Sequence, residues 1–177
     1  MSNNSEYIIP PIDGWMLDEE LYFLYSQAKQ METIIELGSW KGKSTHALAS
    51  GCKGELWCVD HWQGSIGDNS VDLAKQEDIF SIFLDNIKQF KNINILKMST
   101  NEAVKQFEDK SIDMIFIDAS HDYAEVKNDI TNWYPKAKKL ICGHDYQLAF
   151  PGVIQAVNEK IDGVEGGWGS IWFKKII

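Results

Sequence analysis

The chain has 177 residues, of which 44% are hydrophobic and 24% are charged, a balance typical of a single soluble globular domain that excludes a disordered chain. The net charge is −9, and all 17 basic residues are lysines. Because the bidentate recognition of guanine edges and phosphates is mostly the work of arginine, this composition argues against a nucleic-acid-binding protein.

The first residues, Met1 to Glu6, lack the basic and apolar runs of a signal peptide, and no segment reaches the roughly 20 apolar residues that span a bilayer. Cys52, Cys58 and Cys142 are odd in number and show no CxxC spacing, which is typical of reduced thiols. We therefore expect a cytoplasmic protein that has neither a membrane nor a nucleic acid as its partner.

Residues 1–17 are polar at first and then carry two prolines and Gly14, so they predict an arm that lies against the domain. The following segment, 18–28, predicts a helix, because three acids fill its first turn and an apolar stripe follows at helical spacing. We expect the arm and this helix to form an N-terminal region, 1–31, and residues 32–177 to form the main domain.

From residue 33 onward, short apolar runs alternate with segments of helical periodicity. The runs that predict strands are 33–37, 56–59, 93–96, 112–117, 140–142 and 171–173. The segments that predict helices are 44–50, one long helix with Ile79, Phe80, Phe83, Ile87 and Phe90 on one face, a short helix at Val104 and Phe107, and two more at 123–133 and 153–161.

Strands separated by helices imply right-handed βαβ units. The sequence therefore predicts an α/β fold, a single doubly wound Rossmann-like domain with a mostly parallel sheet. The glycine-rich turn at 163–169 precedes the last strand, so we expect a C-terminal hairpin that adds an antiparallel edge.

Polar residues follow four of the predicted strands, at the edge of the sheet where doubly wound folds bind their ligands. These clusters are Glu36–Ser44, Asp60–Trp62, Asp118–His121 and Gly143–Tyr146. In the first cluster, three residues separate Gly38 from Gly42 where a P-loop needs four, and Trp40 stands where a dinucleotide loop needs its middle glycine. Asp60 follows Gly38 by about 20 positions, the separation at which an acid meets ribose hydroxyls. The pair predicts an unphosphorylated nucleoside ligand, and the bulk of Trp40 disfavours an NAD-dependent oxidoreductase.

The motifs Glu36-x-Gly38-x-x-x-Gly42-x-Ser44, Asp60, Ile115 to Asp129, and Gly143 to Tyr146 resemble those of class I S-adenosylmethionine-dependent methyltransferases. More narrowly, they are similar to the group that includes macrocin-type and rhamnosyl O-methyltransferases and the cephalosporin-hydroxylase-like proteins. The resemblance covers about residues 32–160, and the stretch from Asp118 to Asp129 is its most specific part.

The resemblance implies that Glu36, Gly38 and the loop up to Ser44 hold the methionine end of S-adenosylmethionine, that Asp60 takes the ribose, and that Ser99 or Thr100 approaches the adenine. For Ser99 a capping box with Glu102 is the equal alternative, and His121 either contacts the methionine carboxylate or lies in solvent. The candidate cofactor-binding residues are Glu36, Gly38, Ser39, Trp40, Gly42, Ser44, Asp60, His61, Ser99, Thr100, Asp118, Ala119 and His121.

Methyl transfer to a hydroxyl requires an aligned nucleophile and removal of its proton. In related catechol-type enzymes a divalent metal assists, and the corresponding ligands here are Asp118, His144 and Asp145. Oxygen ligands suit Mg²⁺, whereas an imidazole favours another divalent metal. The open alternatives are a metal-free enzyme in which His144 is the general base oriented by Asp145, and a purely structural role for both residues.

The predicted function is therefore O-methylation of a small molecule, and the alternative is a non-catalytic module that binds the nucleoside. Trp15, Trp40, Trp62 and Tyr146 are candidates for an aromatic mouth around a sugar or planar ring. Residues 63–72 predict a lid. The lid, the arm and a second subunit of a homo-oligomer are the expected sources of substrate contacts.

Overall fold

The computed structural model describes residues 7–65 and 69–176, and its centre is a seven-stranded sheet in the order β3-β2-β1-β4-β5-β7-β6. Strands β1 to β5 pair in parallel, whereas β7 pairs antiparallel with both β5 and β6. The doubly wound sheet with an antiparallel edge hairpin is confirmed. The strands are β1 (Thr33–Leu37), β2 (Glu55–Asp60), β3 (Ile93–Lys97), β4 (Ile112–Ile117), β5 (Ala137–Gly143), β6 (Glu165–Trp168) and β7 (Ile171–Lys175).

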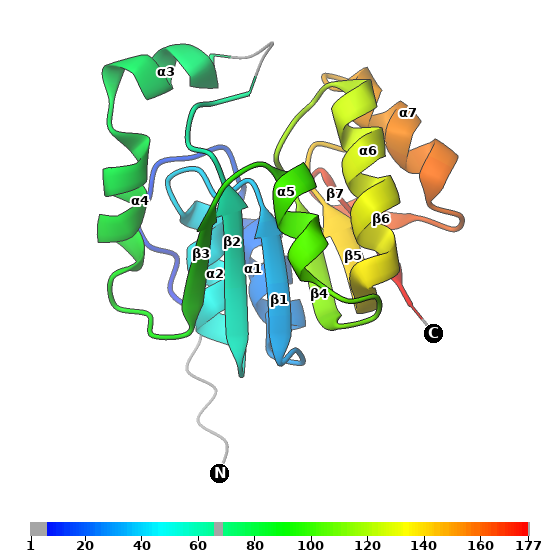
Figure 1. Cartoon of the computed structure of the whole chain (residues 1–177), viewed down its shortest axis with the longest axis horizontal. Helices are drawn as coiled ribbons and strands as arrows, with labels where there is room; N and C mark the ends of the chain where they lie inside the picture. The colour runs from blue at the N-terminus through cyan, green and yellow to red at the C-terminus, as the bar shows by residue number, and fades with distance from the viewer. Residues whose placement is uncertain (1–6, 66–68, 177) are drawn as a thin grey trace.

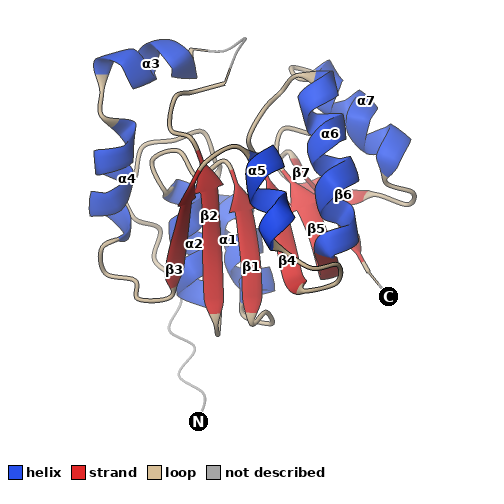
Figure 2. Ribbon diagram, in the orientation of Figure 1, coloured by secondary structure: helices blue, strands red, loops and turns tan. Residues whose placement is uncertain are grey.

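Helices cover both faces of the sheet, with α1 and α2 on one face and α5, α6 and α7 on the other (Figure 1, Figure 2). No helix in the described part of the chain is long and apolar enough to cross a membrane. The helices are α1 (Asp18–Ala28), α2 (Lys43–Gly51), α3 (Ser70–Gln76), α4 (Ile79–Ile87), α5 (Thr100–Ala103), α6 (Tyr123–Trp133) and α7 (Pro151–Lys160), with 3-10 turns at Val104–Gln106 and Tyr134–Lys136.

The apolar runs of the central strands are explained by these two layers. All six residues of β4 are buried, because a strand covered on both faces has no side that meets water. Met114 packs in the cluster that contains α1, α2 and α4, whereas the adjacent Ile115 packs in the cluster that contains α6 and α7. Successive side chains of a strand point to opposite faces of the sheet, so β4 contributes residues to both clusters.

The segment after β2 differs from the prediction. The helix expected to carry Ile79 to Phe90 on one face is α4, which begins at Ile79 and ends at Ile87, before Phe90. A separate helix, α3, precedes it and was not predicted. The Asp78 side chain accepts a hydrogen bond from the N–H of Ser81 and so caps the start of α4. Helix α3 lies partly inside the predicted lid, 63–72, of which residues 66–68 lie outside the described residues.

The turn after β1 passes directly against the end of β4. Gly38 has φ +85°, in the left-handed region, and a Cβ added to it would lie 2.1 Å from the carbonyl oxygen of Asp118. Since β1 and β4 are hydrogen-bonded neighbours, neither backbone is free to move away. A side chain at position 38 is therefore excluded by both the backbone angle and the neighbouring strand.

We expect Gly38→Ala to lower the free energy of unfolding by about 3 kcal/mol or more, because the new methyl group would overlap the β4 backbone. Denaturant unfolding measures this loss. Gly167→Ala is the matched control, since Gly167 has φ +120° but nothing within 4 Å of an added Cβ. It should cost only the backbone strain, about 1 kcal/mol, and equal losses in the two variants would contradict the steric explanation.

Candidate functional site

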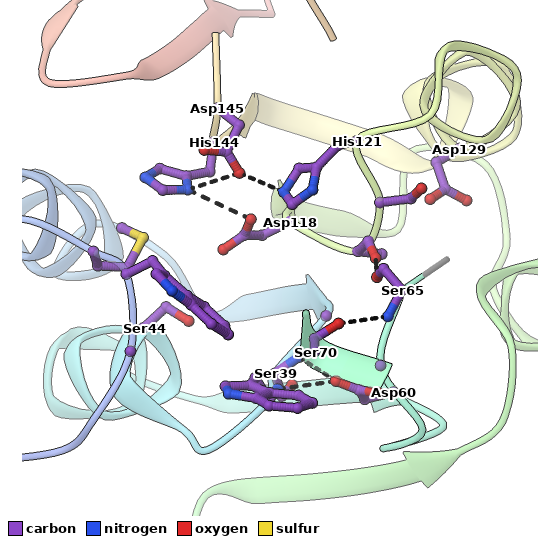
Figure 3. Close-up of a pocket in the computed structure, with 18 of the residues that line it drawn as sticks. Ser39, Ser44, Asp60, Ser65, Ser70, Asp118, His121, Asp129, His144 and Asp145 are labelled. Atoms are coloured by element: carbon purple, nitrogen blue, oxygen red, sulfur yellow. Dashed lines mark hydrogen bonds and ion pairs between the residues drawn. The ribbon is translucent and has the colours of Figure 1, made fainter. Parts of the chain in front are cut away.

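A cavity of about 740 Å³ opens at the carboxyl ends of the parallel strands. Figure 3 shows Asp118, His121, His144 and Asp145 gathered on one side of it, and Ser39 with Asp60 on the opposite side. The two groups come from the ends of β4 and β5 and from the ends of β1 and β2, respectively. All the predicted cofactor-binding residues border this cavity except Glu36 and Gly42.

Glu36 lies behind the first loop and is fully buried. It accepts hydrogen bonds from Ser44 Oγ over 2.6 Å and from Thr45 Oγ1 over 2.5 Å. Burial raises the pKa of Glu36 to about 7, and these two hydroxyls only partly offset the rise. Glu36 therefore holds the first turn of α2 through Ser44 and Thr45, and its side chain is not exposed to the cavity.

Gly42 also points away from the cavity. It has φ +91° and immediately precedes α2, and a Cβ there would lie 3.2 Å from the side chains of Phe83 and Ile87 in α4. Its place in the motif is explained by the left-handed turn that starts α2 and by the packing of that turn on α4. Gly42, predicted among the cofactor-binding residues, does not border the cavity.

The Asp60 carboxylate is bound to the backbone of the first loop. Its Oδ2 accepts the N–H groups of Ser39 and Trp40, each over 2.9 Å, and its Oδ1 accepts the N–H of Trp62 over 2.6 Å. A carboxylate offers about four acceptor positions, so one remains for a ligand hydroxyl. Asp60 thus orders the loop and still presents an acceptor at the cavity wall.

At the end of β3 the capping-box alternative for Ser99 is confirmed, and its contact with adenine stays a prediction. Ser99 and Glu102 form the capping box of α5, and Ser99 nevertheless borders the cavity. Thr100 Oγ1 donates to Asp129 of α6 over 2.6 Å. Asp129, the last residue of the motif that begins at Asp118, had no predicted role; it is buried at the cavity wall, and that burial raises its pKa to about 6.

Four ionisable side chains meet at the ends of β4 and β5. His121 Nε2 lies 2.8 Å from Asp145 Oδ2, and His144 Nδ1 lies 3.3 Å from the same oxygen and 3.5 Å from Asp118 Oδ1. Asp145 has φ +60°, a left-handed conformation that is uncommon outside glycine. Two imidazoles and two carboxylates thus share one side of the cavity.

A fifth residue, Glu20 at the start of α1, completes this cluster, and the sequence analysis gave it no role beyond the helix dipole. Its Oε2 lies 3.0 Å from His144 Nε2 and accepts the N–H of Leu17 over 2.7 Å. Its Oε1 accepts the N–H of Ser170 over 2.7 Å and the Ser170 hydroxyl over 3.0 Å. Only 1% of Glu20 is exposed, so this carboxylate is satisfied entirely by the protein.

The three carboxylates around His144 determine its charge. Burial alone would lower the pKa of His144, but the charge of Asp118 and the hydrogen bonds to Asp145 and Glu20 raise it to about 12. Burial raises the pKa of Asp118, whereas the two histidines hold the pKa of Asp145 well below its usual range despite burial. At neutral pH His144 is therefore an imidazolium, with Nε2 hydrogen-bonded to Glu20 and Nδ1 at ion-pair distance from Asp118 and Asp145.

This charge bears on the predicted roles of His144. An imidazolium has no lone pair with which to accept a proton or bind a metal. The atoms that do converge as ligands belong to Asp118, His121 and Asp145, and all lie within 4.8 Å of one another. His121, for which the alternatives were a contact with the methionine carboxylate or a position in solvent, thus stands in this donor set where the metal prediction had His144.

Only part of the expected aromatic mouth is present. The rings of Trp15 and Trp40 lie 5.8 Å apart at the cavity wall. Trp62 is instead buried against Phe80 and Phe83. Of the expected lid, Ser65 borders the cavity and donates to the carbonyl oxygen of Ala119 over 2.5 Å.

Tyr146 is also not at the mouth. Its hydroxyl donates to Asn158 Oδ1 over 2.7 Å, and the residue does not border the cavity. Trp15 and Trp40 are therefore the two members of the predicted set that a ligand in the cavity would meet.

Comparison with known proteins places the chain in a family. The family model described as "Methyltransferase domain" matches residues 35–146. The protein y4gI of Sinorhizobium fredii is 27% identical over 149 residues, which are 80% of this chain and 16% of that protein. Protein R132 of Acanthamoeba polyphaga mimivirus is 29% identical over 143 residues, which are 76% of this chain and 62% of that protein. The chain therefore spans less than two thirds of each of these relatives.

Among solved structures, the O-methyltransferase from Bacillus cereus in complex with SAH has a TM-score of 0.63 and 16% sequence identity. The superposition covers 93% of this chain and 83% of that one. At this identity the likeness shows a common fold. Together with the family match, it confirms the resemblance to class I methyltransferases.

The raised pKa of His144 predicts a pH-dependent stability. A histidine with a folded-state pKa above its unfolded value stabilises the fold fully below pH 6.5 and loses that contribution as the pH rises toward 12. The advantage of the wild type over His144→Gln in free energy of unfolding should therefore shrink between pH 7.5 and 9, by up to about 1.4 kcal/mol per pH unit. Denaturant unfolding at several pH values, with a chelator present, measures it.

His46→Gln is the control, because burial lowers the pKa of His46 and keeps this ring neutral over the same range. Its difference from the wild type should stay constant between pH 7.5 and 9. A constant difference for His144→Gln as well would show that His144 is not an imidazolium in the folded protein.

Proposed function

The chain belongs to the methyltransferase-domain family, and we propose that it binds S-adenosylmethionine and transfers the methyl group to a hydroxyl of a small molecule. The observation that carries this proposal is that Asp60 and the loop from Gly38 to Ser44 border one cavity with the cluster at Asp118. A nucleoside site and a set of ionisable groups thus face the same space (Figure 3).

The proposed binding of S-adenosylmethionine is supported by the chemistry of the residues that line the cavity. The remaining acceptor position of Asp60 suits a ribose hydroxyl, and a phosphorylated ribose would be repelled by the carboxylate. The start of α2 offers partial positive charge to the carboxylate of an amino-acid tail. Met98, Ser99 and Thr100 line the part of the cavity beyond Asp60, where the adenine ring would lie.

The acceptor half rests on the ionisable cluster. Methyl transfer from a sulfonium is an in-line displacement, so an oxygen nucleophile must be aligned and lose its proton. Asp118, His121 and Asp145 border the cavity and hold oxygen and nitrogen atoms that accept a proton or hold a cation. We assign to His144 the task of holding Asp118 and Asp145 in place through its positive charge, which lies 3.5 Å and 3.3 Å from their oxygens.

A divalent cation fits the same donor set, because two carboxylates and one imidazole converge within 4.8 Å. The imidazole among these donors favours a transition metal such as Mn²⁺ over Mg²⁺. When bound, such an ion would make the acceptor hydroxyl more acidic. The His144 imidazolium lies beside the same carboxylates and would lower the affinity for the ion by charge repulsion.

A non-catalytic, nucleoside-binding module is the second candidate. The protonated state of His144 favours it, since the ring that was expected to act as the base is already charged. Binding of the cofactor without methyl transfer to any acceptor in a screen of phenols, catechols and glycosides would support this second candidate.

We further propose that the acceptor is a small molecule and that the protein acts in the cytoplasm.

Asp60→Ala should weaken the binding of S-adenosylhomocysteine by about 100-fold or more, since it removes the ribose acceptor and frees the loop amides. Asp60→Asn keeps one acceptor oxygen and should lose less. Isothermal titration calorimetry measures both. Asp85→Ala is the control, because Asp85 is 72% exposed on α4 and pairs with Lys88. No binding by the wild type, or unchanged binding by Asp60→Ala, would overturn the proposed function.

Asp118→Asn should weaken the binding of Mn²⁺ to the protein by at least about tenfold, because it removes the charge of one of the two carboxylates in the donor set. Binding is measured by the decrease of the free-ion signal in electron paramagnetic resonance as Mn²⁺ is titrated with protein. Asp129→Asn is the matched control, a buried acid of the same cavity outside the ligand set. Full turnover in a chelator would eliminate the metal-assisted version and leave the methyltransferase itself.

A further inference from the structure

The segment before α1, residues 7–17, is called the arm below, and its last part is a wall of the cavity. Five consecutive residues of the arm, from Asp13 to Leu17, border the cavity. Trp15 is 59% exposed, whereas the adjacent Met16 is buried in the core beside α1. The arm therefore contributes to the site although it belongs to no strand of the sheet.

Lys41, in the loop between β1 and α2, joins the arm to the helices beyond β2. Its Nζ lies 3.0 Å from Asp13 Oδ2 in the arm and 2.7 Å from Glu77 Oε2 between α3 and α4. Only 8% of the Lys41 side chain is exposed, so the ammonium depends on these two carboxylates to compensate its charge. The hydrogen bonds to Glu77 and Asp13 raise its pKa and keep it charged.

Two further contacts attach the arm to the same loop. Lys43 Nζ donates to the carbonyl oxygen of Gly14 over 3.0 Å, and the ring of Trp15 lies beside that of Trp40. The loop is held from its other side by Asn86 of α4, whose Nδ2 donates to the carbonyl oxygen of Lys41 over 2.8 Å. Three consecutive arm residues, Asp13 to Trp15, are therefore held by one short loop.

That loop is also the one whose amides bind Asp60. Ser39 and Trp40 donate to the Asp60 carboxylate, and the next residue is Lys41. The arm leads directly into Glu20, which hydrogen-bonds to His144 of the ionisable cluster. The loop thus lies between the nucleoside part of the cavity and the wall next to that cluster.

We propose that Lys41 is a positioning residue that fixes the arm on the loop from Gly38 to Ser44, so that order in this loop and order in the arm are coupled. The inference rests on the proposed function, because the ligand that orders the loop is the cofactor. Trp15, Met16 and Leu17 then form the wall on the acceptor side, and this wall is complete when Lys41 is paired with Asp13. Binding of the cofactor stabilises the arm, and the arm slows release of the cofactor.

Hydrogen–deuterium exchange of the arm and the dissociation rate of S-adenosylhomocysteine test the proposal. In Lys41→Met, the amides of residues 13–17 should exchange about tenfold faster, and dissociation should accelerate by a similar factor. Lys41→Arg keeps the charge and should restore both values. Lys88→Met is the matched control, since it removes an exposed lysine that pairs with Asp85 at 2.7 Å, and it should change neither.

Asp13→Asn removes the charge with which the arm pairs with Lys41, and it leaves the pair between Lys41 and Glu77 intact. It should also accelerate exchange in the arm and dissociation of the ligand. Unchanged arm exchange in Lys41→Met, or no added protection of the wild-type arm on binding S-adenosylhomocysteine, would overturn the proposal. If the wild type binds no S-adenosylhomocysteine, the proposed function fails, and arm exchange in the ligand-free variants still decides the role of Lys41.

Discussion

The site depends on one constraint, the gathering of negative charge at the carboxyl edge of a parallel sheet. Asp60, Asp118 and Asp145 end three strands that open into one cavity, and Glu20 and Glu36 are buried close to them. Each acid is compensated differently: Asp60 by backbone amides, Glu36 by hydroxyls, and the other three by the His144 imidazolium. Since an uncompensated buried charge is costly, these partners determine the loop geometry around the site.

The sequence was sufficient for the sheet and for the edge that carries the site. Continuous apolar runs such as that of β4 are recognisable because both faces of the strand are buried, and the carboxyl ends of parallel strands lie at one edge. The sequence therefore predicts that Asp60, Asp118 and Asp145 lie at one edge of the sheet. It does not predict their side-chain partners, because hydrogen bonds between distant segments leave no local pattern.

Glu20 and α3 illustrate two different reasons for what was missed. Glu20 looks like an acid favoured by the helix dipole, and nothing nearby in the sequence indicates its contacts with His144 and with Ser170, 150 residues away. Helix α3 has one buried residue, Ser70, so it shows no apolar periodicity. The start of α4 did leave a signal in the sequence, the Asp78–Ser81 cap directly before Ile79.

The pairing of His144 with Glu20 explains how this chain departs from the catechol-type pattern. That pattern has a carboxylate where this sequence has His144, and a neutral histidine there would leave Asp118 and Asp145 to repel each other on their shared side of the cavity. A buried carboxylate behind the ring raises the pKa of the imidazole, so that a positive charge is held between the two acids. Because Glu20 belongs to α1, this helix sets the charge of the ionisable cluster. The arm that precedes the helix lines the cavity beside the cluster, so both are parts of the site.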